Sequence, residues 1–136
     1  MQRPNRIRFV SVIAVSFLAI PSCNLCACPP LTSSGAVLGY ATDATEAPVT
    51  DVLISVFVPL PTSSGVELFE PGSDFTDSTG FYSLHFADVM VIDSVLVRAK
   101  PDIVSGLTVE EKWAVNSRWR QYYPDSVRVD FVLRPT

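Results

Sequence analysis

The predicted fold of this chain is decided by the stretch Phe75-Thr76-Asp77-Ser78-Thr79-Gly80-Phe81-Tyr82-Ser83-Leu84. Asp77 and Ser78 can accept hydrogen bonds from backbone N–H groups just downstream, and Gly80 can take a positive φ without a Cβ clash. After this turn, apolar and polar side chains alternate with the period of a strand. The stretch therefore predicts a hairpin in which two short strands meet at the turn formed by Asp77 and Gly80. Since its polar groups serve the turn, it indicates fold and not chemistry.

Further short strands are predicted on both sides of this hairpin. Alternating runs rich in β-branched residues cover residues 35–42, 51–58, 94–100 and 127–133. Residues 59–74 contain three prolines and two glycines, so they predict an irregular loop that is too long for a simple turn, with Leu68 and Phe69 as a short edge strand.

Two interpretations of residues 107–123 are open. Thr108 and Glu111 have the spacing of a helix capping box, and several apolar pairs have i, i+4 spacing. The same residues also alternate as a strand with Leu107, Trp113 and Val115 on one face. We favour the strand because the neighbouring segments are strands of similar length.

Six or seven short strands separated by turn signals indicate an all-β domain. The prediction is a single antiparallel β-sandwich of Greek-key type that covers residues 35–136. A signal peptide and a short tether precede it.

Residues 1–22 have the layout of a secretory signal peptide. Arg3, Arg6 and Arg8 precede an apolar run over residues 9–20. This run is too short to cross a bilayer comfortably, since a spanning helix needs about 20 apolar residues.

The end of this segment resembles the lipobox of bacterial lipoproteins. Ile20-Pro21-Ser22-Cys23 carries the pattern, with proline as a departure from it, and Leu25-Cys26-Ala27-Cys28 is a second candidate. We favour Cys23 as the lipidated residue because it directly follows the apolar run, with Cys28 as the alternative. The other interpretation is an ordinary secreted protein that keeps Cys26 and Cys28 as thiols or in intermolecular disulfides.

The lipobox resemblance implies a thioether-linked diacylglycerol on Cys23 and a further acyl chain such as palmitate on its amino group. Several acyl chains hold a protein on a membrane, since each buried methylene contributes about 0.8 kcal/mol. Residues 23–34, rich in proline, serine and threonine, are predicted to form a flexible tether. Asn24 is not the aspartate that commonly retains lipoproteins in the inner membrane, so the predicted address is the cell envelope, at the outer membrane.

The charge balance argues against a nucleic-acid partner. Three of the ten basic residues precede Cys23 and all fourteen acidic residues follow it, so the chain from Cys23 onward is strongly acidic. The acids are scattered along the chain, which is typical of a solvated surface and not of a metal cage.

Four segments together resemble the carboxypeptidase regulatory-like domain, a transthyretin-like or prealbumin-like β-sandwich. They are residues 35–43, 52–56, 76–84 and 129–133. Glu46 stands where the family often has glycine. The resemblance implies a spacer, folding or recognition module and no catalysis.

The enzymatic relatives of that fold use donors that this sequence lacks. Intradiol dioxygenases need two histidines and two tyrosines around iron, and hydroxyisourate hydrolases need several histidines, whereas this chain has His85 alone. We therefore predict that the chain is not an enzyme and has no catalytic residue, metal or cofactor.

The candidate ligand-binding residues are Trp119, Arg120, Tyr122 and Tyr123, just before the last predicted strand. Aromatic faces beside planar polar donors suit a sugar ring or a peptide. The other interpretation is that Trp113 belongs to the core and that the remaining aromatic residues pack a long loop against the sandwich.

The favoured function is a non-enzymatic, membrane-anchored envelope lipoprotein domain that binds a protein partner or gives structural support. The alternative is a carbohydrate-binding module of the same fold that uses the aromatic stretch of residues 113–123.

Overall fold

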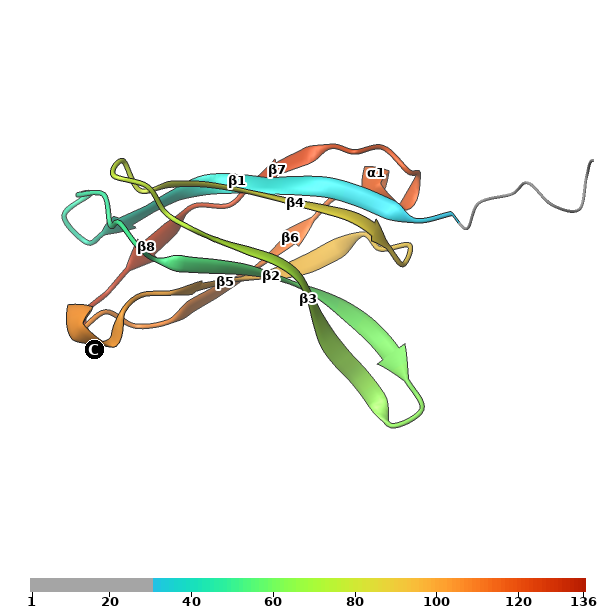
Figure 1. Ribbon diagram of the computed structural model, residues 1–136, viewed down its shortest axis with the longest axis horizontal. Helices are drawn as coiled ribbons and strands as arrows, with labels where there is room; N and C mark the ends of the chain where they lie inside the picture. The colour runs from blue at the N-terminus through green and yellow to red at the C-terminus, as the bar shows by residue number, and fades with distance from the viewer. Residues whose placement is uncertain (1–30) are drawn as a thin grey trace, which may run out of the picture. The chain divides into compact units, whose positions relative to one another are not determined.

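Two β-sheets packed face to face make up the part of the chain that the computed structural model describes, residues 31–136 (Figure 1). The predicted β-sandwich is confirmed, with eight strands in this range instead of six or seven. The predicted signal peptide and the lipid candidates Cys23 and Cys28 lie outside the described residues. Within residues 31–136, no helix is long and apolar enough to cross a membrane.

The first sheet is built around β1 (Ser33–Asp43). β4 (Phe81–Val89) pairs with it antiparallel along one edge. On its other edge β1 pairs in parallel with β7 (Ser126–Arg128) and then with β8 (Phe131–Leu133). The single strand predicted for residues 127–133 is therefore two strands, and the sheet is mixed and not purely antiparallel.

The second sheet has the strand order β3-β2-β5-β6 and is antiparallel throughout. Its strands are β2 (Leu53–Thr62), β3 (Gly65–Phe75), β5 (Ser94–Lys100) and β6 (Glu110–Val115). Two short helices lie in the connections after β5 and β6. They are η2 (Ile103–Ser105) and α1 (Ser117–Arg120).

The core lies between the two sheets and follows the period-two pattern of the strands. Tyr82, Leu84 and Phe86 of β4 are buried while the residues between them are not, as the alternation predicts. The larger core side chains from the other strands are Val37, Ile54, Val56, Val58, Val95, Val97, Phe131 and Leu133.

The first strand begins earlier than predicted, inside the segment assigned to the tether. Ser33 is fully buried, and its hydroxyl donates to the Trp119 carbonyl (2.9 Å) and accepts from the Ile92 N–H (3.0 Å). Ser33 therefore ties the start of β1 to Trp119 near the C-terminal strands and to the loop after β4, and it belongs to the sandwich.

The predicted hairpin at residues 75–84 is wrong in one respect, because β3 and β4 belong to different sheets. The buried Thr76 ends the β3 ladder. Its hydroxyl donates to the Val49 carbonyl (2.7 Å) and accepts from the Val52 N–H (3.0 Å), which fixes the chain as it leaves the second sheet. After the turn the chain continues as β4, which pairs with β1 in the first sheet.

The turn itself uses the groups that the sequence indicates. The Asp77 carboxylate accepts from the Thr79 N–H (2.8 Å), the Thr79 hydroxyl (2.7 Å) and the Phe81 N–H (3.1 Å). Gly80 has a φ of +78°. An equivalent turn follows β1, where Asp43 makes the same three kinds of bond and Glu46 takes the positive φ of 66°.

Replacing Gly80 by alanine is expected to lower the free energy of unfolding by about 2 kcal/mol. The new Cβ would sit at a positive φ and 2.4 Å from the Ala41 carbonyl oxygen. Thermal unfolding followed by circular dichroism measures the loss. Gly106→Ala is the matched control, since Gly106 also has a positive φ (+69°) but a Cβ there meets open space. Equal losses in the two variants would contradict the role of the close approach.

The Asp77 turn also predicts a pH dependence. The side-chain hydrogen bond from Thr79, helped by the backbone N–H bonds, lowers the pKa of Asp77 from its usual 3.8. A lowered folded-state pKa gives stability that is present above pH 3.8 and is lost as the pH falls through the folded-state value. The melting-temperature gap between wild type and Asp77→Asn should therefore be widest at neutral pH and narrow in acid. A gap that stays constant over the pH series would refute this.

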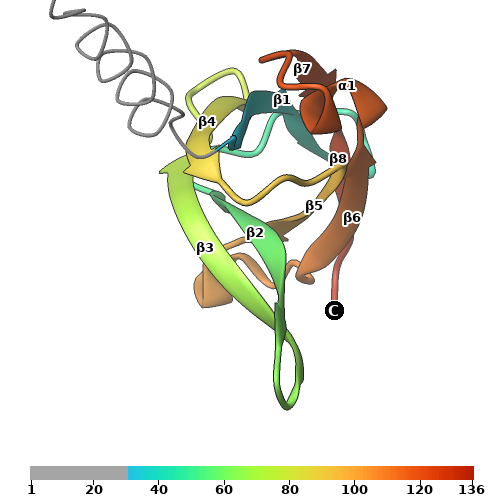
Figure 2. The same cartoon turned by 90° about the vertical axis from the view of Figure 1, so that its right-hand side faces the viewer.

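Most of the predicted loop at residues 59–74 is instead a long two-stranded arm, residues 59–71. β2 continues to Thr62, the chain turns at Ser63 and Ser64, and β3 returns from Gly65. Past Phe57, the last residue of β2 that pairs with β5, the two strands of the arm extend away from the sandwich (Figure 2). The prolines did not prevent strand formation, because at an edge position the missing N–H would have faced solvent and no ladder hydrogen bond is lost.

Residues 107–123 contain both of the predicted structures in succession. The strand is present as β6, and the helix is the single turn α1, whose N-cap Asn116 accepts from the Arg118 N–H (2.9 Å). Ala114 is the buried residue of β6, whereas Trp113 and Val115 point to solvent. The interpretation of Trp113 as a core residue is therefore wrong.

Candidate functional site

The predicted aromatic site is divided by the fold, because Trp119 lies inside the sandwich. Its side chain has no exposed surface, its ring meets Phe86 edge-on with centroids 5.2 Å apart, and its Nε1–H donates to the Asp125 carbonyl (2.8 Å). Contrary to the prediction, Trp119 is a core residue that has no surface to offer a ligand.

The other three predicted residues, Arg120, Tyr122 and Tyr123, stay at the surface. Arg120 pairs with Asp93 (2.9 Å) across to the β4–β5 loop. The Arg118 guanidinium lies 4.6 Å from the Tyr123 ring centroid and pairs with Asp125 (2.8 Å). One face of Tyr123 is therefore covered from within the chain. Tyr122, at a φ of +65°, is 44% exposed and Tyr123 is 49% exposed, so both rings remain about half accessible.

A different aromatic cluster lies on the outer face of the second sheet. The register places Phe57 of β2 beside Leu96 of β5, and Leu96 beside Trp113 of β6. These three side chains form a row across neighbouring strands, in which Leu96 is buried between the two rings and Trp113 is 55% exposed. Val115, two residues after Trp113, extends the same face. We call Phe57, Leu96, Trp113 and Val115 the apolar strip.

A charged pair borders the apolar strip on the next row of the sheet. The Arg98 guanidinium carbon lies 4.5 Å from the Phe57 ring centroid, and its Nε is 2.6 Å from Glu111 Oε1. Arg98 thus combines a cation–π contact with an ion pair and is held flat against the strip. The cluster offers rigid aromatic surface with a positioned guanidinium beside it.

The same outer face carries a groove at the far end of these strands. It has a volume of about 360 Å³, and its walls include Leu53, Phe75, Pro101 and Ile103. This end of the sheet therefore has exposed apolar surface as well.

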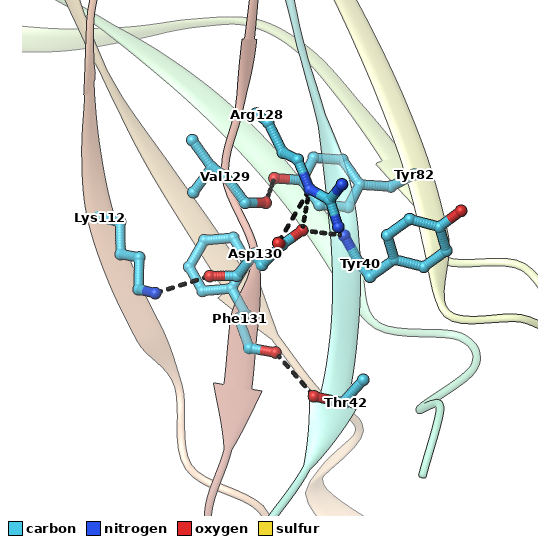
Figure 3. A network of polar contacts seen from close by, with 8 residues as sticks. All are labelled: Tyr40, Thr42, Tyr82, Lys112, Arg128, Val129, Asp130 and Phe131. Carbon is cyan, nitrogen blue, oxygen red and sulfur yellow. Dashed lines mark hydrogen bonds and ion pairs between the residues drawn. The ribbon is translucent and has the colours of Figure 1, made fainter. Parts of the chain in front are cut away.

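A polar network joins the two sheets where β1 changes its partner from β7 to β8 (Figure 3). The Asp130 carboxylate accepts from the Tyr40 N–H (2.9 Å) and pairs with Arg128 Nε (2.9 Å). Lys112 Nζ donates to the Asp130 carbonyl (2.6 Å). Since every one of these groups holds a strand in place, the network is structural.

The Tyr82 hydroxyl completes this network from inside the core. It donates to the Val129 carbonyl (2.5 Å), and burial, with a smaller contribution from the Asp130 charge, raises the pKa of Tyr82 far above its usual range. The hydroxyl therefore stays protonated as a donor and is no candidate for acid–base chemistry near neutral pH.

Sequence reasoning missed the apolar strip for an identifiable reason. The alternation of Val109, Trp113 and Val115 shows that they share a face, but both faces of a strand can be apolar. The strand order shows that the opposite face carries Ala114 into the core, so the larger residues point outward.

No family model matches the chain, and no curated protein matches it either. Solved structures do match its fold. The dioxygenase domain of a dioxygenase and carbohydrate-binding protein fusion from Streptomyces sp. SirexAA-E is 18% identical, with 81% of this chain and 85% of that chain covered and a TM-score of 0.51. Another match is 3-chlorocatechol 1,2-dioxygenase from Rhodococcus opacus 1CP, at 12% identity, 78% and 62% coverage and a TM-score of 0.53.

The chain thus spans less than two thirds of the length of the chlorocatechol enzyme. A 5-hydroxyisourate hydrolase from Klebsiella pneumoniae is also similar, at 12% identity, 75% and 91% coverage and a TM-score of 0.47. The chain therefore shares its β-sandwich fold with the two dioxygenase structures.

These neighbours correct the expectation that the chain is not an enzyme. That expectation rested on a family resemblance that implies no catalysis and on the presence of a single histidine, whereas solved structures with the same fold include dioxygenases. The prediction of a non-catalytic domain from its fold is therefore wrong.

The residues of this chain do not fit an iron site of two histidines and two tyrosines. His85 is the only histidine of the sequence and lies exposed on β4, while the Tyr82 hydroxyl is bound to Val129 in the core. No group of three or more histidine, cysteine or acidic side chains in residues 31–136 is placed to hold a metal ion. No reaction step is therefore derived through iron.

Proposed function

We propose that the chain is a carboxypeptidase regulatory-like domain of an envelope lipoprotein that binds a protein partner, or supports an envelope assembly, through the apolar strip. The observation that carries this proposal is Trp113, a tryptophan more than half exposed in a row with Phe57 and Leu96 on a sheet face.

Exposed aromatic residues beside an ordered arginine are typical of surfaces that bind other proteins. Tryptophan and arginine are enriched among the residues that dominate binding energy. Tryptophan does so because it gives large, rigid contact area at low entropic cost. The Arg98 guanidinium, fixed between Phe57 and Glu111, is already ordered before a partner arrives. A rigid surface of this kind suits a folded protein partner.

The anchor is a separate part of the proposal and has its own test. Cys23→Ala is expected to abolish incorporation of radiolabelled palmitate in intact cells, while Cys28→Ala leaves it unchanged. The opposite pattern would move the anchor to Cys28. If both variants still incorporate the label, the lipid anchor is refuted, and with it the assignment to the envelope surface.

Capture of the partner by chemical crosslinking tests the strip. Trp113→Ala is expected to lose the crosslinked partner while the melting temperature changes by only a few degrees, since the ring is more exposed than buried. Tyr122→Ala is the matched control, an exposed aromatic residue away from the strip. Equal capture by wild type and Trp113→Ala would refute the proposal.

Carbohydrate binding is the second candidate, and the exposed Tyr122 ring is the observation that favours it. With Trp119 buried, the predicted aromatic site is reduced to the half-exposed rings of Tyr122 and Tyr123, and Arg118 lies over one face of Tyr123. Glycan-array binding that is lost in Tyr122→Ala and kept in Trp113→Ala would favour this candidate over protein binding.

A further inference from the structure

The arm formed by residues 59–71 is the most exposed part of the described chain. Every residue from Pro61 to Glu70 is exposed, although the segment forms regular strands. Two-stranded ribbons are marginal in water when nothing covers them. Figure 2 shows the arm extending below the sandwich, where β5 no longer accompanies it.

The register shows which backbone groups of the arm are free. Its two-residue turn makes Thr62 and Gly65 the hydrogen-bonded pair that closes the hairpin. Hydrogen-bonded and non-hydrogen-bonded pairs alternate along antiparallel strands, so Pro61–Val66 and Pro59–Leu68 are non-hydrogen-bonded pairs. The N–H and C=O groups of Val66 and Leu68 therefore point away from β2, along the outer edge of β3.

The two edges of the arm differ in what they can bind. On the β2 edge the outward residues are Pro59 and Pro61, which have no N–H to donate. On the β3 edge, Val66 and Leu68 offer both donors and acceptors, and β3 pairs only with β2 in the part of the chain that the structure describes. Only the β3 edge can receive a further strand with a complete ladder.

The side chains of the arm indicate the chemistry of such a strand. Val66 and Leu68 share one face with Pro59 and Pro61, and this face continues from Phe57 along β2. Glu67 is on the opposite face together with Phe69, and Glu70 lies at the register shift, where it has no cross-strand partner. Residues 59–74 contain no lysine or arginine, and neither glutamate is part of an ion pair among residues 31–136.

We propose that the β3 edge of the arm binds an extended segment of a partner protein as an added strand, and that this segment alternates apolar with basic residues. Its apolar side chains cover Val66 and Leu68 on one face, and its basic side chains meet Glu67 on the other. A second copy of β3 is disfavoured, because it would bring acidic side chains against acidic ones. The inference rests on the proposed function only in requiring a protein partner, since it uses a different surface from the apolar strip.

A synthetic peptide of alternating valine and lysine is the probe, added to the full purified chain and followed by fluorescence anisotropy. A peptide of alternating valine and glutamate is the charge control. We expect the lysine peptide to bind at least about tenfold more tightly at low salt, and the difference to shrink as salt is added. Equal binding of the two peptides would overturn the assigned partner chemistry.

Backbone pairing is tested on both molecules. Leu68→Pro removes an outward N–H and leaves the hydrogen-bonded pairs of the arm intact, so binding of the lysine peptide should fall by roughly tenfold or more. Leu68→Thr keeps the N–H and should retain most of the binding. Two lysine peptides test the same bonds without changing the protein. One is N-methylated on its odd-numbered residues and the other on its even-numbered residues.

Binding that survives Leu68→Pro and both methylated peptides would overturn strand addition. This failure is distinct from failure of the proposed function. Crosslinked capture that depends on Trp113 but is unaffected by Leu68→Pro would refute the added strand and leave the apolar strip as the binding surface.

Discussion

Replacing Trp119 by alanine is expected to lower the free energy of unfolding by about 4 kcal/mol, the largest effect predicted for a single side chain of this protein. The ring is fully buried and packs edge-on against Phe86, so its removal leaves a large cavity. The change also removes the Nε1–H donor to the Asp125 carbonyl. Equilibrium unfolding in urea measures the loss.

Tyr122→Ala is the control for this experiment. Tyr122 lies three residues after Trp119, but its ring is exposed, so the free energy of unfolding should change by less than about 1 kcal/mol. A Trp119→Ala variant as stable as wild type would show that the tryptophan is not a core residue. It would reopen the interpretation of this stretch as a ligand site.

Replacing Gly39 by alanine is expected to cost about 3 kcal/mol, because the first sheet has no room for a Cβ there. The added carbon would lie 1.9 Å from the Val129 carbonyl oxygen, which is backbone and cannot rotate away. That oxygen also accepts a hydrogen bond from the Tyr82 hydroxyl, and the Val129 N–H donates a hydrogen bond to the Leu38 carbonyl (2.8 Å). Accommodating the Cβ therefore disturbs both of these bonds.

Gly72→Ala is the matched control for Gly39→Ala. Gly72 is also a strand glycine, but the nearest atom to its added Cβ is the His85 carbonyl oxygen at 3.6 Å, an ordinary contact. The free energy of unfolding should be close to that of wild type in Gly72→Ala and clearly lower in Gly39→Ala. Similar values for the two variants would contradict the close approach of β1 to the β7–β8 junction.

Local patterns in the sequence predicted the strands but not how they pair. The alternation of Tyr82, Leu84 and Phe86 and the positive φ at Gly80 follow from single-residue chemistry, so both could be inferred. That β4 pairs with β1 and not with β3 depends on Thr76, whose hydroxyl bonds to residues of a distant loop. Long-range bonds of this kind leave no local signal.

The aromatic residues show the same limit. Trp113 and Trp119 are equally apolar, but Trp119 on α1 fills the core, whereas Trp113 on β6 faces solvent because its neighbour Ala114 occupies the core face. The arm was missed because its prolines favour a loop in any local reading. In the fold they lie on a free edge, where a missing N–H costs nothing.

The central claim is that the apolar strip binds a protein, and site-specific photo-crosslinking in intact cells tests it most directly. A photoreactive amino acid in place of Trp113 is compared with the same amino acid in place of His85, which is exposed on the other sheet. We predict a discrete crosslinked product from position 113 and none from position 85. No product from position 113, or the same products from both positions, would contradict the proposed binding surface.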